Sequence, residues 1–118
     1  DPEENEKPVL EVLIYQDRYE VAERKSSSVL AVVEKSADGL HDREGLREFL
    51  GKVKAQFPDV TNITLLCEED TPYELMIYTM DAVRYRVEVI NGIAIKKELF
   101  PEIGIGTAPA DARLGGDV

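Results

Sequence analysis

The sequence predicts an α+β fold, with a mixed or largely antiparallel sheet and two helices packed on one of its faces. One observation is a series of short segments in which apolar and polar residues alternate, as they do in half-buried strands. The other is a pair of segments with helical periodicity, residues 43–56 and 72–85. From these two observations together we expect an α+β arrangement.

Four strands are expected before the second helix. The segment Val9–Tyr15 places Leu10, Val12 and Ile14 on one face, and Tyr19–Glu23 places Tyr19 and Val21 opposite Glu20 and Ala22. Val29–Val33 is β-branched and predicts a third strand, although so short a run does not exclude a helical turn. In the fourth strand, residues 61–67, the apolar face carries Ile63, Leu65 and Cys67.

The first helix has one continuous apolar stripe, and His41 or Asp42 is its expected N-cap. His41 is expected to be an exposed loop residue, and Pro58 ends the helix. The stripe recurs at helical spacing and consists of Leu46, Phe49, Leu50, Val53 and Phe57.

The second helix has a marked start signal. Thr71 is the expected N-cap, Pro72 fits the first helical position, and Glu74 is placed to close a capping box. Apolar residues cover most of its circumference, so we expect either a protein partner on Ile77, Tyr78 or Met80, or cover from the segment that follows.

The C-terminal part predicts a hairpin and one more strand. Asn91-Gly92 between alternating apolar residues indicates a hairpin over residues 86–97. Ile103 and Ile105 alternate with glycines in an expected edge strand, residues 102–106. The domain is expected to span residues 9–107, between a flexible linker (1–8) and a disordered tail (108–118).

The composition excludes some functions. The chain has 118 residues, one domain's worth, and a net charge of −10, which argues against nucleic-acid binding and against docking on an anionic membrane surface. No apolar run reaches the 18 or so residues that a spanning helix needs. The single cysteine, Cys67, is expected to be a packing residue on the buried face of its strand.

The acidic turn Glu68-Glu69-Asp70 permits two interpretations. Three adjacent carboxylates can bind a cation, but acidic residues before a helix also stabilise its positive N-terminal end. Asp81 is either a general acid or, with Arg84 and Arg86 nearby, half of a structural ion pair. We favour the structural interpretation and predict no catalytic residue, no metal site and no cofactor, because nucleophile–base and phosphate-binding motifs are lacking.

Three segments together resemble the periplasmic domain of the ExbD/TolR biopolymer-transport family. They are Asp70-Thr-Pro-Tyr-Glu-Leu, Tyr78-Thr-Met-Asp-Ala-Val-Arg84 and Leu99-Phe-Pro-Glu-Ile-Gly-Ile-Gly106, in the order in which such domains carry them. The resemblance covers residues 9–106, and an inserted stretch at residues 86–98 and an extra strand near Val29 depart from the shortest members.

The resemblance implies a non-enzymatic subunit of a motor driven by the proton-motive force, on the periplasmic face of the bacterial inner membrane. Its implied partners are a channel subunit like ExbB, TolQ or MotA and a periplasmic protein like TonB or TolA, with peptidoglycan binding left open. The proton-carrying aspartate of the family lies in a single N-terminal membrane helix, which would precede this chain. The motor would energise biopolymer or protein transport, or envelope maintenance.

The expected interface residues lie on the second helix and the last strand. They are Ile77, Tyr78, Met80, Ile103, Gly104 and Ile105, and we also expect a weak homodimer. The rival hypothesis is a small metal-binding or hydrolytic domain that uses Glu68, Glu69, Asp70 and Asp81.

Overall fold

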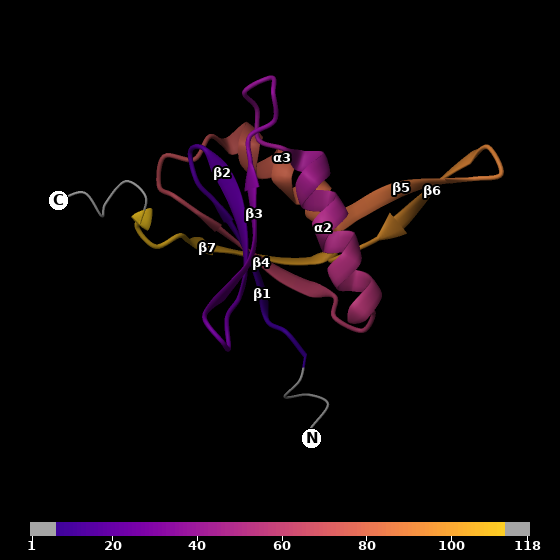
Figure 1. Cartoon of the computed structure of the whole chain (residues 1–118), viewed down its shortest axis with the longest axis horizontal. Coiled ribbons are helices and arrows are strands. Elements are labelled where there is room, and N and C mark those ends of the chain that lie inside the picture. Colours follow the sequence, from indigo (N-terminus) through magenta and orange to yellow (C-terminus); the bar gives the residue numbers. More distant parts are fainter. Residues whose placement is uncertain (1–6, 113–118) are drawn as a thin grey trace.

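The fold of residues 7–112 is described by a computed structural model of the chain. A sheet carries two helices on one face, and a separate two-stranded hairpin projects from the body (Figure 1). The elements in chain order are β1 (Leu10–Ile14), β2 (Arg18–Glu23), β3 (Ser28–Glu34), α2 (Arg43–Gln56), β4 (Asn62–Cys67), α3 (Tyr73–Arg84), β5 (Tyr85–Ile90), β6 (Ile93–Glu98) and β7 (Glu102–Thr107).

The main sheet is mixed and has the order β3-β2-β1-β4-β7. The three strands β1, β4 and β7 are parallel, whereas β2 pairs with β1 and β3 in antiparallel ladders. A register shift between Val21 and Ala22 marks an irregularity in the ladder of β2 and β3. The predicted α+β class and the short third strand are therefore confirmed.

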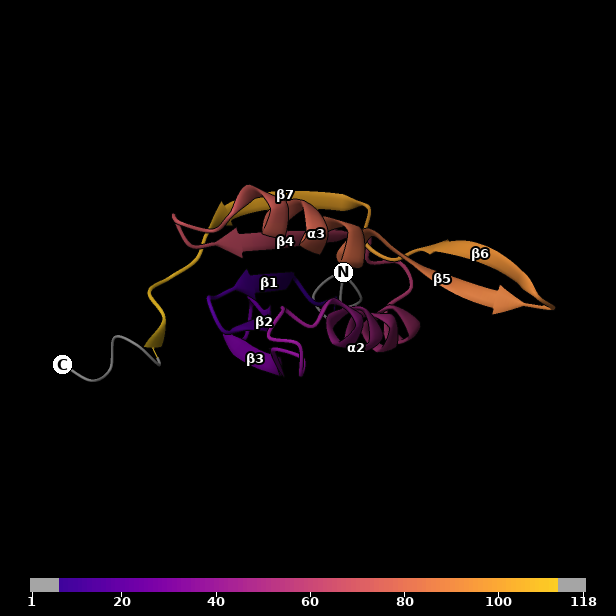
Figure 2. The ribbon, with the colours of Figure 1, turned by 90° about the horizontal axis from the view of Figure 1, so that it is seen from above.

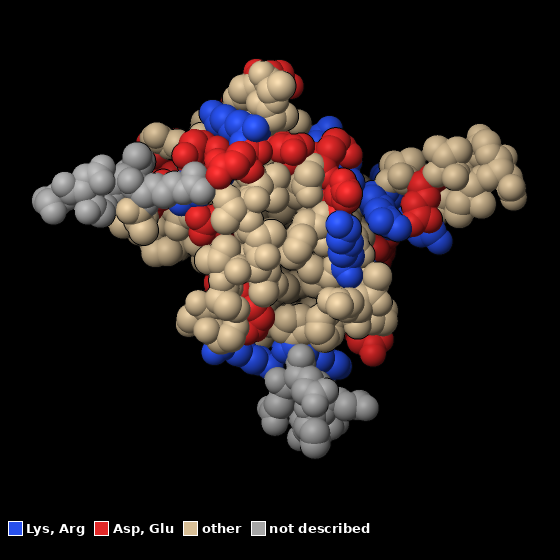
Figure 3. Space-filling view, viewed as in Figure 1, with Lys and Arg blue, Asp and Glu red and all other residues tan. Residues whose placement is uncertain are grey.

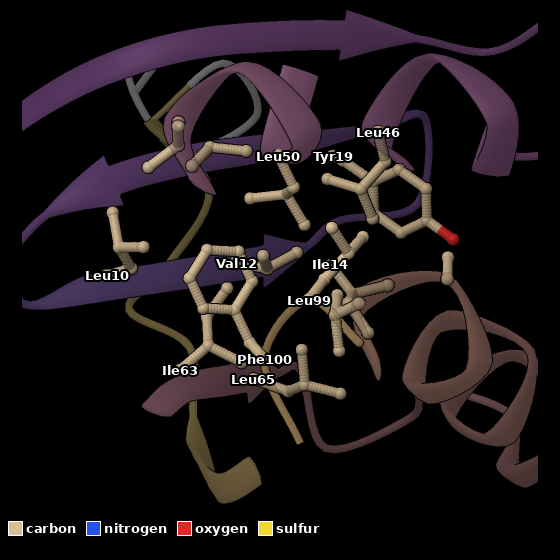
Figure 4. Packing of buried hydrophobic residues seen from close by; sticks show 14 of the residues in the cluster. Leu10, Val12, Ile14, Tyr19, Leu46, Leu50, Ile63, Leu65, Leu99 and Phe100 are labelled. Carbon is tan, nitrogen blue, oxygen red and sulfur yellow. The ribbon is translucent and has the colours of Figure 1, made fainter. Parts of the chain in front are cut away.

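The hydrophobic core lies between the sheet and the two helices (Figure 4). The alternation read from the sequence holds on each strand, since cross-strand pairs such as Val12 with Leu65 and Ile14 with Tyr19 share a face. Both the aromatic ring of Tyr19 and that of Phe100 are fully buried. The strand and helix residues at the centre are Leu10, Val12, Ile14, Val21, Ile63, Leu65, Leu46, Leu50, Ala82 and Val83.

Helix α2 begins and packs as the sequence predicts. Asp42 is its N-cap, and the Asp42 Oδ1 carboxylate accepts a hydrogen bond of 3.0 Å from the Gly45 N–H. Leu46, Leu50 and Val53 are buried, while Phe49 and Phe57 are partly buried against the core. The preceding residue, His41, was expected in an exposed loop, but it is buried and its ring lies 4.9 Å from that of Tyr19.

The start of α3 differs from the prediction by one residue. Pro72 is the N-cap, with an extended ψ of 139°, so the helix begins at Tyr73 and Thr71 lies outside it. No side chain caps this end, and the Pro72 carbonyl accepts the first bonds from Leu75 and Met76. The capping box expected from Thr71 and Glu74 was therefore wrong, because a proline fixes its own φ but leaves ψ free to remain extended.

The hairpin of β5 and β6 is confirmed at the predicted position. Asn91 and Gly92 have φ of 53° and 77°, the left-handed values that a tight two-residue turn requires. The hairpin, here called the arm (Tyr85–Glu98), extends away from the body in both views (Figures 1 and 2). At its root, the Leu99 and Phe100 N–H groups donate to the Arg84 and Val83 carbonyls, which fixes the arm to the end of α3.

The other face of the sheet is partly covered by residues 108–112, here called the strap. The strap was expected to be the start of a disordered tail, but it lies against the β1 and β2 side of the sheet, where Tyr15 contacts Pro109 and Arg18 contacts Asp111. Asp111 is buried and forms two hydrogen bonds, of 2.7 and 3.0 Å, with the Arg18 guanidinium. The remainder of the expected tail (113–118) and most of the expected linker (1–6) lie outside the described residues.

Candidate protein-interaction surfaces

Strand β7 is one border of the main sheet and pairs only with β4 within the described chain. The Glu102 and Ala108 N–H groups donate to the β4 side, at Thr61 and Cys67. Because backbone groups alternate along a strand, the N–H groups of Ile103, Ile105 and Thr107 point outward from the sheet. The described structure thus leaves an open edge six residues long.

The three site residues predicted on β7 lie together on this edge. Ile103 is partly buried against the core, while Ile105 is 54% exposed on the helix-bearing face. Gly104 points to the opposite face, where an added Cβ would meet Thr64 Oγ1 at 3.6 Å, an ordinary contact. The edge can therefore accept a side chain at position 104 without distortion.

Helix α3 brings only part of its predicted surface close to this edge. The helix contacts β7, and Met80 packs partly against the core, while Ile77 is 41% exposed. Tyr78 lies two residues from Met80, which places it roughly 200° away around the helix axis. Its ring stacks under the Arg43 guanidinium of α2 at 4.1 Å, so Tyr78 belongs to the junction of the two helices.

The arm is a further exposed surface, and the site predictions omitted it. Val87, Val89 and Ile93 are 60%, 72% and 64% exposed, values that are unusual for β-branched residues in a sheet. The sequence did predict a hairpin here, and one of the two expectations for the second helix was that this hairpin covers it. In the structure it contacts the helix only near its root, so its outer part remains uncovered by this chain.

The acidic turn lies at the mouth of a small hollow of about 360 Å³ that also contains His41 and Lys35. The His41 Nε2 lies 2.6 Å from the Tyr15 carbonyl oxygen, so this ring nitrogen is already engaged. Burial, followed by the neighbouring Asp70, raises the pKa of Glu68 above its ordinary value. Among residues 7–112, no three His, Cys, Asp or Glu side chains are arranged to hold a metal ion.

Asp81 is not part of that turn. It lies on the exposed side of α3, eight residues after Tyr73 and therefore about 12 Å along the helix axis. The expected ion pair with Arg84 or Arg86 is not formed, since Arg86 binds Glu88 instead. The rival hypothesis required the turn and Asp81 to act together, and the fold separates them.

Two buried groups have structural roles. Cys67 is buried on the inner face of β4, as predicted, and burial raises the pKa of its thiol. The Tyr19 hydroxyl lies 2.7 Å from Thr79 Oγ1, which in turn donates to the Leu75 carbonyl at 2.8 Å. Burial raises the pKa of Tyr19 to about 12, so this pair remains neutral and joins β2 to α3.

Comparisons with known proteins do not place the chain in a family. No family model, curated protein or solved structure matches the chain. Within the described residues, neither helix has the length and apolar character needed to cross a membrane.

Proposed function

We propose that this chain is the periplasmic domain of an ExbD/TolR-like motor subunit, which couples proton flow across the bacterial inner membrane to transport or envelope maintenance. One observation carries the proposal: the three segments that resemble the family fold into adjacent parts of one structural unit. Residues 70–75 form the turn and the first helical residues, 78–84 form the body of α3, and 99–106 form the connection and β7. Helix α3 and strand β7 are in contact.

The open edge beside this unit fits a role in binding another protein. An extended peptide can add to an open sheet edge by backbone hydrogen bonds, with specificity supplied by alternate side chains. Ile103 and Ile105 offer apolar side chains on one face, and Gly104 and Gly106 leave the other face bare. A TonB- or TolA-like protein is the proposed periplasmic partner, and an ExbB-, TolQ- or MotA-like channel the proposed membrane partner.

In this proposal the domain performs no chemistry of its own. It acts mechanically, from an anchor helix that precedes residue 1 and that carries the proton-binding aspartate of the motor. A change in the membrane can bias the domain only through a physical connection. Strand β1 is the element that receives this connection, since it is the first strand and lies at the centre of the sheet.

The test is complementation of a strain that lacks the complete protein. The domain fused to a spanning helix with one intramembrane Asp should restore transport, whereas the same domain secreted without an anchor should not. The matched control is the Asp→Asn change in the fused helix, which should abolish rescue while leaving the amount of protein unchanged. Rescue by the unanchored domain, or by the Asn fusion, contradicts the proposal.

The contribution of the edge is tested in the rescuing fusion. Ile105→Pro removes one outward N–H from β7 but keeps the ladder to β4, and we expect it to reduce transport. Ile105→Val retains both the N–H and the β-branched shape, so it should transport normally. Equal transport by the two variants would show that the edge is not used.

A further inference from the structure

The tip of the arm is apolar on both faces. In the two rungs next to the turn, one face carries Ile90 and Ile93, and the other carries Val89 and Ala94. Ile90, Val89 and Ile93 are 42%, 72% and 64% exposed. Because the arm stands away from the body, neither α2 nor α3 covers the tip (Figure 2). A contiguous exposed apolar surface marks a contact with a partner or with a membrane.

Basic side chains begin a fixed distance behind the tip. No charged side chain occurs among residues 89–94, and the exposed Lys96 and Lys97 follow on β6. As neighbours in a strand they point to opposite faces, so each face has one cation. They lie three and four residues beyond Ile93, about 10 and 13 Å along the strand. Figure 3 shows the same order, with few charges toward the outer end and basic side chains where the arm leaves the body.

The acidic residues of the arm do not reverse this pattern. Glu88 binds the Arg86 guanidinium, so its charge is offset, and Glu98 is the last residue of β6, at the root. The net charge of the arm is +1 in a chain of −10, which leaves −11 for all other residues. The charged residues counted for the arm are Arg86, Lys96, Lys97, Glu88 and Glu98.

The interface of a lipid bilayer fits this order of side chains. An added strand covers only one edge of a hairpin, whereas a bilayer surrounds an inserted tip on every side. Bases behind an apolar tip meet the phosphate layer, toward which long side chains extend. The Lys96 ammonium already points this way, since it lies 4.1 Å from the centre of the Tyr85 ring, toward the root. Tyrosine is itself enriched at the level of the headgroups.

The backbone of the arm limits the depth of insertion. Strands β5 and β6 pair only with each other, so in the described chain both of their outer edges are open. Open edges do not occur in the hydrocarbon core, because their N–H and C=O groups would lack partners there. Interfacial elements bury their apolar side chains about 5–10 Å into the boundary between headgroups and acyl chains. The two apolar rungs and the turn span about 7–10 Å, which matches this depth.

The acidic body does not prevent this contact. Each strand of the arm has six residues, about 20 Å, so an inserted tip leaves about 10 Å of arm between the membrane and the body. This is more than the Debye length of about 8 Å at physiological ionic strength, so repulsion of the body by an anionic surface is largely screened. The expectation against docking on such a surface therefore applies to the body and not to the arm.

We propose that the arm inserts its tip, residues 89–94, into the interface of a lipid bilayer that contains anionic lipid, with Lys96 and Lys97 at the phosphate groups. The insertion holds the domain at a membrane surface through a hairpin. It uses neither the β7 edge nor the N-terminal connection, so it is independent of the motor function proposed above.

Flotation with lipid vesicles tests the insertion. The chain is mixed with vesicles of phosphatidylcholine and phosphatidylglycerol and separated on a density gradient, and we expect it to float with them. With phosphatidylcholine alone the affinity should be about fivefold lower, because the lysines then meet no net negative charge. Lys96→Gln combined with Lys97→Gln should remove this difference between the two lipid compositions. Failure to float with either kind of vesicle refutes the proposal.

A matched pair of double variants separates the tip from other exposed apolar residues. Val89→Thr with Ile93→Thr keeps the side chains β-branched but makes the tip polar, and should lower the vesicle affinity at least about tenfold. Val29→Thr with Val32→Thr makes a similar change on β3, where the valines are 56% and 44% exposed, and should leave the affinity unchanged. Circular dichroism confirms that both variants are folded. Equal affinities of the two folded variants would show that the arm is not the membrane contact and would overturn the proposal.

A fluorescent label then locates the inserted residues. Since Cys67 is buried, a polarity-sensitive dye can be attached at Val89→Cys, with Val29→Cys as the control. On addition of vesicles, the dye at position 89 should shift its emission to shorter wavelength and be quenched by lipids brominated on their acyl chains. The dye at position 29 should do neither. A shift at position 89 that needs no vesicles and grows with protein concentration would show that the arm binds protein instead, which contradicts the proposal.

Discussion

The strap should contribute to the stability of the whole domain, although it is only a few residues that follow β7. The substitution Asp111→Ala measures this contribution as a loss of unfolding free energy. The Arg18 side chain is 2% exposed, and its hydrogen bonds with Asp111 hold the pKa of the guanidinium above its ordinary value. Asp17 and Glu20 also bind Arg18, at 2.6 and 2.8 Å. The Arg18 guanidinium in addition lies 4.5 Å from the centre of the Tyr15 ring.

Removing one partner of a buried ion pair usually costs about 3–5 kcal/mol, because the other charge stays buried without compensation. Here two carboxylates remain, and release of the strap can let water reach Arg18, so we expect a loss of about 2–3 kcal/mol. For a chain of 118 residues this corresponds to a fall in Tm of about 8–12 °C. Urea and thermal unfolding, followed by far-ultraviolet circular dichroism, measure both quantities.

Asp17→Ala is the matched control, because Asp17 binds the same guanidinium but its side chain is 55% exposed. We expect it to cost less than about 0.5 kcal/mol. A double-mutant cycle with Arg18→Met and Asp111→Leu should give a coupling of about 1 kcal/mol or more, since each single variant leaves one buried charge of this pair without the other, whereas the double variant removes both. A loss below about 0.5 kcal/mol in Asp111→Ala would refute the view that the strap belongs to the folded domain.

Three further predictions concern single contacts. Asp42→Ala should lower the free energy of urea unfolding by about 1 kcal/mol, because it removes the capping hydrogen bond to Gly45. Thr71→Ala should leave it nearly unchanged, because Thr71 lies outside α3. An equal loss in the two variants would contradict the observed start of α3. The Val9 and Ser26 N–H groups lower the pKa of Glu23 from 4.5 to about 2, so stability that is present above pH 4.5 should be lost as the pH falls toward 2. Stability measured across this range should depend less on pH in Glu23→Gln, and identical curves would exclude the shift. Tyr19→Phe should cost about 1 kcal/mol in thermal unfolding, as it deletes a buried hydrogen bond to Thr79, and no change would show that the bond contributes nothing.

Most of the secondary structure could be predicted from local sequence patterns. The position of the hairpin follows from Asn91-Gly92, which must adopt left-handed φ, and the stripe of α2 follows from helical spacing. Both signals concern neighbours in sequence. The burial of His41 and Asp111 could not be predicted in this way, since each is held by a residue far along the chain, Tyr15 and Arg18 respectively.

The same limit applies to the candidate interaction surfaces, for which the sequence supplies local signals only. Pro101 and the alternating glycines indicated an edge strand, and β7 is one. The exposure of the arm is a tertiary property: the sequence shows that residues 86–97 pair with each other, but not whether the pair folds back over α3. The apolar pattern that places Tyr78 on an expected partner surface cannot show that Arg43, from another helix, lies over its ring.

The position of β1 connects the proposed mechanical role to the stability of the domain. A pull that enters from the N-terminal side meets Val9 first, whose N–H is bound by Glu23 and whose carbonyl accepts from the Arg24 N–H. Beyond this point the force runs along β1, which is hydrogen-bonded to β2 on one side and to β4 on the other. Because the strand is pulled lengthwise, the hydrogen bonds of both ladders bear the force together. The clamp at Val9 consists of two bonds near the surface, so it should open well before the central ladders. In the proposed motor, opening it would lengthen the tether while β4 and the β7 edge beside it remain in place, which lets the anchor move without disturbing a bound partner.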